Sequence, residues 1–346
     1  MARLLTTGFE TGTYENNGGL FTGTGTNVQV QSTVRRTGAY ALQVPCGVNP
    51  NGYIVQIVSD VAEIYFRIAF RHGHAGSGDG TNTKLLSFHE GGTEHVSIGI
   101  TSDTLLSRLV VRGSTADTGS IVFSQSTWYM IEGYVKIANS GGAVTVKVNG
   151  TTDLTYSGDT CATANEFMTS IRIGAQSGME NYSYYFDDVA INDTAGDYQN
   201  SWIGLGGIFY LEPTADGTTN DWTPSSGTVN YAMVDDIPPD NATTFVQALD
   251  TADRDLYVID DCPQYVNTIN LVEVVYRAAV AESGYNYLRD VVYVAGTAYT
   301  GLTSTIVPIT PSFTYYHGTV HYINPNTGTA WGTAEVNAME AGIEVA

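Results

Sequence analysis

Six histidines are the first residues to examine for metal chemistry. His72 and His74 are separated by one residue in a glycine-rich segment, with His89 and His95 further along the chain. A His-x-His pair can supply two ligands to a transition metal. No cysteine or carboxylate joins them at the spacing of a metal site, so we favour solvated loop histidines. The segment also lacks a Gly-Lys-Ser/Thr sequence, which argues against a phosphate-binding loop and favours a hairpin loop.

The other possible metal ligands are isolated from one another. His317 and His321 lie four residues apart in a strand pattern, ~13 Å along the strand, which is too far to share one ion. Cys46, Cys161 and Cys262 are odd in number and widely spaced, so we expect free buried thiols rather than a disulfide framework.

Carboxylates were considered for glycoside hydrolysis, which needs a pair of them flanking the scissile bond. Period-2 alternation would place such a pair on one face of a strand in a Glu-x-Asp-x-x-Glu or Glu-x-Asp-x-Glu sequence, and neither occurs. Glu63 and Glu132 are single acids within strand patterns, where we expect strand-edge positions or local ion pairs. The sequence therefore predicts no enzymatic activity.

The elements that would position these residues are strands. Period-2 alternation between Gly, Asn, Asp and Ser turns recurs through the first 192 residues, with no convincing helix. In residues 143–150, Val144, Val146 and Val148 share one face, and Asn149-Gly150 signals a type I′ turn. This pattern predicts a two-sheet antiparallel sandwich. The predicted strands are 40–45, 52–58, 63–71, 84–89, 96–100, 105–112, 127–138, 143–148, 167–174 and 182–191.

Composition changes after this region. Residues 197–265 hold five of the ten prolines among acidic and Gly/Ser/Thr-rich turns, which predicts an extended connector. Strand patterns return at 268–281, 289–295, 303–309, 312–316 and 319–323, and residues 331–342 predict a short helix with Thr333 as N-cap and Gly342 at its end. We therefore predict an all-β protein with a sandwich at 1–196, a connector at 197–265 and a smaller β-rich domain at 266–346.

Charge narrows the range of partners. The net charge is −21, and residues 201–346 hold 17 acidic but only 3 basic residues. Phosphate neutralisation needs clustered Lys and Arg, so nucleic acid is excluded as a partner, and an anionic membrane surface is disfavoured. The sequence shows no secretory signal and no membrane-spanning apolar run, from which we expect synthesis in a host cytoplasm.

Three segments carry a family resemblance. They are Gly8-Phe9-Glu10, residues 127–137 with the hairpin that ends Val148-Asn149-Gly150, and residues 184–191 with the sequence YYFDDVAI. In combination they resemble the concanavalin A-like (laminin-G-like) lectin and glucanase superfamily over residues 3–192. The resemblance implies a jelly-roll sandwich. Related modules pair an early Glu with an Asp of the closing strand around a structural Ca²⁺, which makes Glu10 and Asp188 candidate ligands and Asp187 a weaker one. The alternative is that the two aspartates only bind backbone amides.

The remainder resembles segments that follow such domains in structural proteins of tailed phages. It carries the sequences NSWIG from Asn200, LEPTADG from Leu211, VDDIPPD from Val234 and NPNTGTAW from Asn324. The resemblance implies a non-enzymatic virion surface protein that decorates the capsid. It would associate with its own copies and with a capsid or tail protein. The alternative is a tail or fibre protein that binds a host glycan, and a glycoside hydrolase or lyase with an unrecognised site is a third hypothesis.

Overall fold

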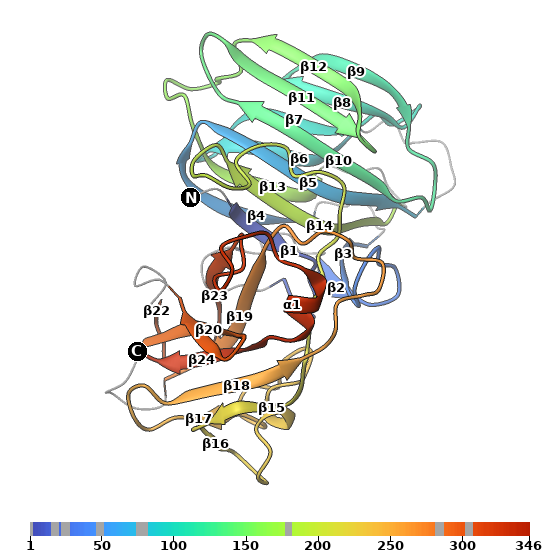
Figure 1. Ribbon diagram of the computed structural model, residues 1–346. Helices are drawn as coiled ribbons and strands as arrows, with labels where there is room; N and C mark the ends of the chain where they lie inside the picture. The colour runs from blue at the N-terminus through green and yellow to red at the C-terminus, as the bar shows by residue number, and fades with distance from the viewer. Residues whose placement is uncertain are drawn as a thin grey trace. The chain divides into compact units, whose positions relative to one another are not determined.

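The computed structural model describes residues 3–14, 21, 28–45, 52–73, 82–176, 182–280, 287–301 and 307–346. The chain divides into two compact units, the first running to Phe209 and the second beginning at Tyr210 (Figure 1). This division falls inside the predicted connector, and the predicted boundaries at 196/197 and 265/266 stay a prediction.

The first unit contains two antiparallel sheets. The larger has the strand order β12-β11-β10-β5-β14-β3-β2, with β1 paired to β14. Its strands are β1 (Arg3–Thr7), β2 (Gln29–Gln31), β3 (Ala41–Val44), β5 (Glu63–His72), β10 (Tyr129–Lys136), β11 (Gly142–Val148), β12 (Thr151–Gly158) and β14 (Tyr184–Asp193). The smaller sheet has the order β4-β13-β6-β7-β8-β9. Its strands are β4 (Gly52–Val61), β6 (Thr83–Glu90), β7 (Thr93–Ile100), β8 (Leu106–Val111), β9 (Ser114–Val122) and β13 (Met168–Gln176).

Alternation along the strands explains how these sheets form a sandwich. Val144, Val146 and Val148 of β11 are at most 1% exposed, as their period-2 spacing predicts. Asn149 and Gly150 both have positive φ, 50° and 82°, which is the backbone of a type I′ turn. One apolar cluster draws buried side chains from both sheets, so the core lies between them. The prediction of an all-β sandwich is confirmed.

The two faces of the smaller sheet differ in chemistry, because one packs on the apolar core and the other carries polar residues. Leu86 and Phe88 of β6 and Ile171 and Ile173 of β13 belong to the apolar core. The residues that alternate with them point to the opposite face, which we call the outer face of the smaller sheet. Three register shifts, in β13, β6 and β7, decide which residues reach that face.

The second unit is built on a sheet with the order β15-β18-β24-β20-β21, with β22 paired to β20. The elements are β15 (Pro213–Asn220), β18 (Arg254–Ile259), β20 (Tyr287–Val294), β21 (Thr297–Thr300), β22 (Val307–Pro308) and β24 (Glu340–Val345). Two-stranded sheets pair β16 (Thr223–Pro224) with β17 (Val246–Gln247) and β19 (Val272–Ala278) with β23 (Thr314–His321). A 3-10 helix, η1, covers Tyr231–Met233.

The predicted helix at 331–342 is present but shorter. Helix α1 covers Thr333–Asn337, and Gly332 rather than Thr333 is its N-cap. The Gly332 N–H donates to the Glu335 carboxylate over 2.7 Å. Gly342 does not end the helix but lies in β24, where a Cβ would stand 1.9 Å from the Asp255 carbonyl oxygen. Close approach of two strands, and not a helix end, explains this glycine.

Candidate functional site

The predicted calcium ligands lie together in the first unit. Glu10 is 8% exposed, and one of its carboxylate oxygens accepts the Ala39 N–H over 2.7 Å. Its other oxygen, Oε1, is buried without a hydrogen-bond partner. Burial raises the pKa of Glu10 to about 7, and the negative charge of Asp188 adds to the rise. Glu10 is therefore a carboxylate with one coordination position to offer.

Asp188 is differently placed. It is fully buried, and its Oδ2 atom lies 2.6 Å from the Arg36 guanidinium. Its Oδ1 atom accepts the Thr37 hydroxyl over 2.5 Å and the Ile208 N–H over 2.7 Å. Both oxygens are thus engaged, and a cation already balances the charge. Asp188 in this arrangement does not fit the role of a Ca²⁺ ligand, since Ca²⁺ takes six to eight oxygen atoms.

Asp187 supports the alternative stated from the sequence, since its partners are backbone amides. It accepts the N–H groups of Arg36 and Asp188, both over 2.8 Å. Burial and the neighbouring Asp188 raise its pKa to about 8. Among the described residues, no three His, Cys, Asp or Glu side chains are grouped to hold a metal. Calcium binding by Glu10 and Asp188 stays a prediction.

The other acids of the first unit have local partners. Glu63 pairs with the Lys136 ammonium over 2.8 Å and accepts the Tyr134 hydroxyl. Glu132 is buried and accepts the Gly204 N–H over 2.8 Å.

The histidines are not the solvated loop residues that the sequence indicated. His72, His89 and His95 all belong to strands and are 0%, 3% and 0% exposed, while His74 lies outside the described residues. His95 has a structural role, since its Nδ1 atom accepts the Ala162 N–H over 2.9 Å and its Nε2 atom lies 3.1 Å from the Phe167 carbonyl oxygen. His89 is the one that stands among other polar groups on a sheet face.

These groups lie on the outer face of the smaller sheet, on three adjacent strands. In the ladder, Arg172 of β13 pairs with Ser87 of β6, which pairs with Ser97 of β7. On one side of this row His89 pairs with Glu94, and on the other Gln176 pairs with Lys84. We call these seven residues the polar cluster.

A chain of hydrogen bonds fixes the chemistry of His89. The Ser87 hydroxyl donates to Gln176 Oε1 over 2.7 Å. Because a hydroxyl has one proton, Ser87 Oγ can only accept in its 2.7 Å contact with His89 Nε2. His89 Nε2 therefore carries the proton, and Nδ1 keeps a lone pair that meets no partner. Gln176 Nε2 and Ser97 Oγ are also buried without partners.

Burial keeps His89 neutral. Burial and, after it, the Arg172 guanidinium together lower the pKa of His89 to about 4, while Glu94 opposes the shift. Arg172 itself stacks over the Tyr53 ring at 5.2 Å. Lys84 Nζ lies 2.7 Å from Glu94 Oε2, which is 3.9 Å from His89 Nε2. The polar cluster thus holds a neutral imidazole, that of His89, beside the side chains of Arg172 and Lys84. Such a group can accept a proton next to a bound anion.

Sequence reasoning missed this cluster for a physical reason. Ser87 and His89 alternate with Leu86 and Phe88, as side chains on the solvent face of any half-buried strand would. What distinguishes them is burial on that face, which alternation does not report. Arg172 and Gln176 join them from 83 or more residues further along the chain, in a β13–β6 pairing that contains one register shift.

Comparison with known proteins finds partial structural similarity only. No protein-family model matches the chain, and no curated protein matches it. Three solved structures resemble part of it. Cip1, a cellulose-induced protein, is 16% identical with a TM-score of 0.45, over 58% of this chain and 100% of that one. An endo-β-1,4-glucuronan lyase from Trichoderma reesei is 16% identical with a TM-score of 0.40, over 51% and 93%. The alginate lyase Aly36B is 13% identical with a TM-score of 0.40, over 56% and 98%.

These structures share the sandwich fold, which agrees with the concanavalin A-like resemblance, while a phage context finds no support in them. They also correct two predictions. Polysaccharide lyases and other glycan-active enzymes predominate among the similar structures, and this finding contradicts the predictions of a non-enzymatic virion protein and of no enzymatic activity. That prediction relied on missing paired carboxylates, which glycoside hydrolysis requires but other reactions of polysaccharides do not. The predicted partners and location are untested.

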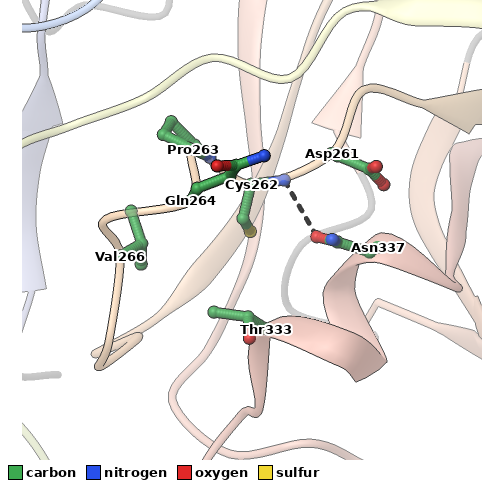
Figure 2. Close-up of a pocket in the computed structure, with 7 residues that line it drawn as sticks. All are labelled: Asp261, Cys262, Pro263, Gln264, Val266, Thr333 and Asn337. Carbon is green, nitrogen blue, oxygen red and sulfur yellow. Dashed lines mark hydrogen bonds between the residues drawn. The ribbon is translucent and has the colours of Figure 1, made fainter.

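The second unit offers a second location, a pocket of about 310 Å³. Figure 2 shows that the residues lining it come from the 261–266 segment, which includes Cys262, and from helix α1. Its lining residues are Asp261, Cys262, Pro263, Gln264, Val266, Thr333 and Asn337. The Cys262 N–H donates to Asn337 Oδ1, and burial raises the pKa of the Cys262 thiol. A thiol held protonated is a poor nucleophile, so this pocket offers less chemistry than the polar cluster.

No helix among the described residues has both the length and the apolar character needed to cross a membrane.

Proposed function

We propose that the first unit cleaves an acidic polysaccharide by β-elimination, with the polar cluster as its active site. The observation that carries this proposal is His89, a buried imidazole with a free nitrogen, beside Arg172 and Lys84. A neutral base next to fixed cations suits a substrate whose reactive C–H bond is adjacent to a carboxylate.

Elimination on a uronate sugar needs a base, a proton for the leaving oxygen, and cationic donors beside the carboxylate. The C5–H bond breaks as a base takes the proton, a double bond forms between C4 and C5, and the C4–O bond to the neighbouring sugar breaks. The leaving oxygen gains a proton, so no water is consumed. Negative charge develops on the carboxylate attached to C5 during proton removal, and cationic donors stabilise it.

The polar cluster supplies these contributions from named residues. His89 Nδ1 has the lone pair that accepts the C5 proton, while Ser87 and Gln176 hold the ring through Nε2. Arg172 presents a planar fork of N–H donors that matches a carboxylate. Lys84, whose side chain is 35% exposed, adds a second positive charge at the solvent side. The proton that His89 takes goes on to the leaving oxygen.

Cleavage of defined polysaccharides tests the proposal. The full chain is incubated with uronate polysaccharides and with neutral polysaccharides of the same linkage. Ultraviolet absorbance reports the new conjugated double bond, and mass spectrometry reports whether water has been added. We expect unsaturated products from uronates only. His89→Gln should slow cleavage by roughly 10²- to 10⁴-fold, the usual contribution of a general base.

The matched control is His317→Gln in the second unit, whose partner there is Glu273. It should cleave at the wild-type rate. Hydrolysis products that contain added water, or full activity in a folded His89→Gln protein, would overturn the proposal.

A further inference from the structure

The ion pair between Lys84 of β6 and Glu94 of β7 joins two residues that are not opposite each other in the ladder. Lys84 pairs in the ladder with Gly99, and Glu94 pairs with His89. These two pairs flank the Ser87–Ser97 pair on the same two strands. Since Nζ and Oε2 are nevertheless 2.7 Å apart, both side chains must extend toward each other over that central pair.

The burial of Ser87 and Ser97 is consistent with this path of the Lys84 and Glu94 side chains. Ser87 and Ser97 are 0% and 1% exposed, although their side chains project from the sheet face opposite the core. Ser97 Oγ has no hydrogen-bond partner, and neither has His89 Nδ1. A sugar cannot reach these atoms while Lys84 and Glu94 remain joined.

Glu94 also stands where a substrate carboxylate would be expected to bind. Its Oε2 atom contacts the Lys84 ammonium and lies 3.9 Å from His89 Nε2. It is the only acid among the seven residues of the polar cluster, and its partner there is the Lys84 ammonium. A carboxylate of the protein itself, that of Glu94, thus pairs with the Lys84 ammonium.

We propose that Glu94 is an internal substitute for the substrate's carboxylate, and that a uronate sugar opens the site by replacing it at Lys84. The proposal rests on the proposed function, because it assigns the anion recognised at the same site. The exchange is feasible because the Lys84 side chain is 35% exposed and the Glu94 side chain 18%, and ion pairs open to water are weak. Lys84 gives up one ion pair and forms another, so the number of ion pairs at Lys84 is unchanged, and the released Glu94 carboxylate turns to solvent. A neutral sugar offers no such replacement and leaves the bridge closed.

Binding measurements separate this proposal from catalysis. Affinities of uronate oligosaccharides, and of the same oligosaccharides after reduction of their carboxyl groups, are measured by calorimetry with the full chain. A His89→Gln background prevents turnover. Glu94→Gln, which keeps the shape but removes the charge, should tighten uronate binding by about 5-fold or more, the lower end of typical coupling between sites. Binding of the reduced oligosaccharides should not tighten with it.

Glu90→Gln is the control, because Glu90 ends β6, the strand of Lys84 and His89, but bonds to Asn165 outside the polar cluster. It should leave uronate affinity unchanged. A second readout needs no ligand: in a protein with His89 intact, Glu94→Gln should lower the pKa of His89 measured by NMR, because Glu94 favours the protonated ring.

The outcomes distinguish the two proposals. Cleavage of uronates by the wild type, with uronate affinity unchanged or weakened in Glu94→Gln, overturns the internal substitute alone. Tighter uronate binding in Glu94→Gln without cleavage by the wild type supports the substitute and overturns the lyase. Absence of uronate binding in every variant overturns both.

Discussion

His89 Nε2 and Ser87 Oγ lie 2.7 Å apart on the same strand, two residues apart, with the Ser87 proton directed to Gln176. This contact does more than anchor the ring, because it decides which nitrogen is protonated. The lone pair of Nδ1 is free only while Ser87 accepts from Nε2. The chemistry assigned to His89 therefore depends on a hydroxyl that would not itself touch the reacting atoms.

Removal of that hydroxyl should be costly. Ser87→Ala leaves the His89 Nε2–H and Gln176 Oε1 without a partner in a buried place. We expect a loss of about 1–3 kcal/mol in the free energy of unfolding, the usual cost of an unsatisfied buried group. A mixture of His89 tautomers should appear in nitrogen-detected NMR, and chemical denaturation measures the stability.

Ser97→Ala is the matched control for this experiment. Ser97 faces Ser87 in the ladder, but its hydroxyl has no partner to lose. Its removal should change the unfolding free energy by less than about 0.5 kcal/mol or raise it slightly. Equal losses in the two variants would contradict the hydrogen-bond chain.

Arg172 should control the protonation of His89. Its guanidinium is a named cause of the low His89 pKa, after burial. Arg172→Met removes the charge and keeps an unbranched chain over Tyr53, so the pKa of His89 should rise from about 4 toward its ordinary 6.5. An NMR titration of the imidazole measures this shift. If the pKa of His89 stays the same or falls, Arg172 lies too far from the imidazole ring for both residues to bind one sugar.

Glu10 makes a prediction about stability and pH. Its folded pKa of about 7 lies above its ordinary value of 4.5, so between these values the folded state binds more protons than the unfolded state. The stability that protonated Glu10 contributes should therefore be fully present below pH about 4.5 and should be lost as pH rises through about 7. Glu10→Gln should remove this part of the pH dependence. Denaturation in the presence of a chelator, at several pH values, measures it.

Calcium binding provides a second test of the role of Glu10. If Glu10 and Asp188 bind Ca²⁺ as the sequence predicts, the ion should raise the melting temperature of the wild type and not that of Glu10→Gln. An unchanged wild-type melting temperature would be contrary to the calcium prediction and would leave Arg36 as the cation that balances Asp188.

Much of the fold could be predicted because alternation reports which strand face is apolar. Val144, Val146 and Val148 are buried as expected, and the turn at Asn149-Gly150 forms as expected. Strand β9 was not predicted, since Ser114–Val122 carries only three apolar side chains and pairs through its backbone at a sheet edge. Calcium candidates came from a resemblance, whereas the polar cluster depends on register. A sequence does not show that Gln176 and Gly99 lie opposite Lys84, because a register shift in each ladder sets these two pairings.

One of these register shifts can be tested directly at Gly99. Gly99 pairs with Lys84 beside the register shift, and a Cβ there would lie 2.0 Å from the Thr83 carbonyl oxygen. Gly99→Ala should force these strands apart and cost about 1–3 kcal/mol, as overpacking in a rigid place does. Lys84 would move with its strand, so uronate cleavage should fall together with stability. Gly92→Ala, in the turn of the same hairpin, meets nothing within 4 Å and should be close to neutral in both measurements. A neutral Gly99→Ala would mean that the strands can shift, and the positions of Lys84 and Glu94 would then not be fixed by the register shift.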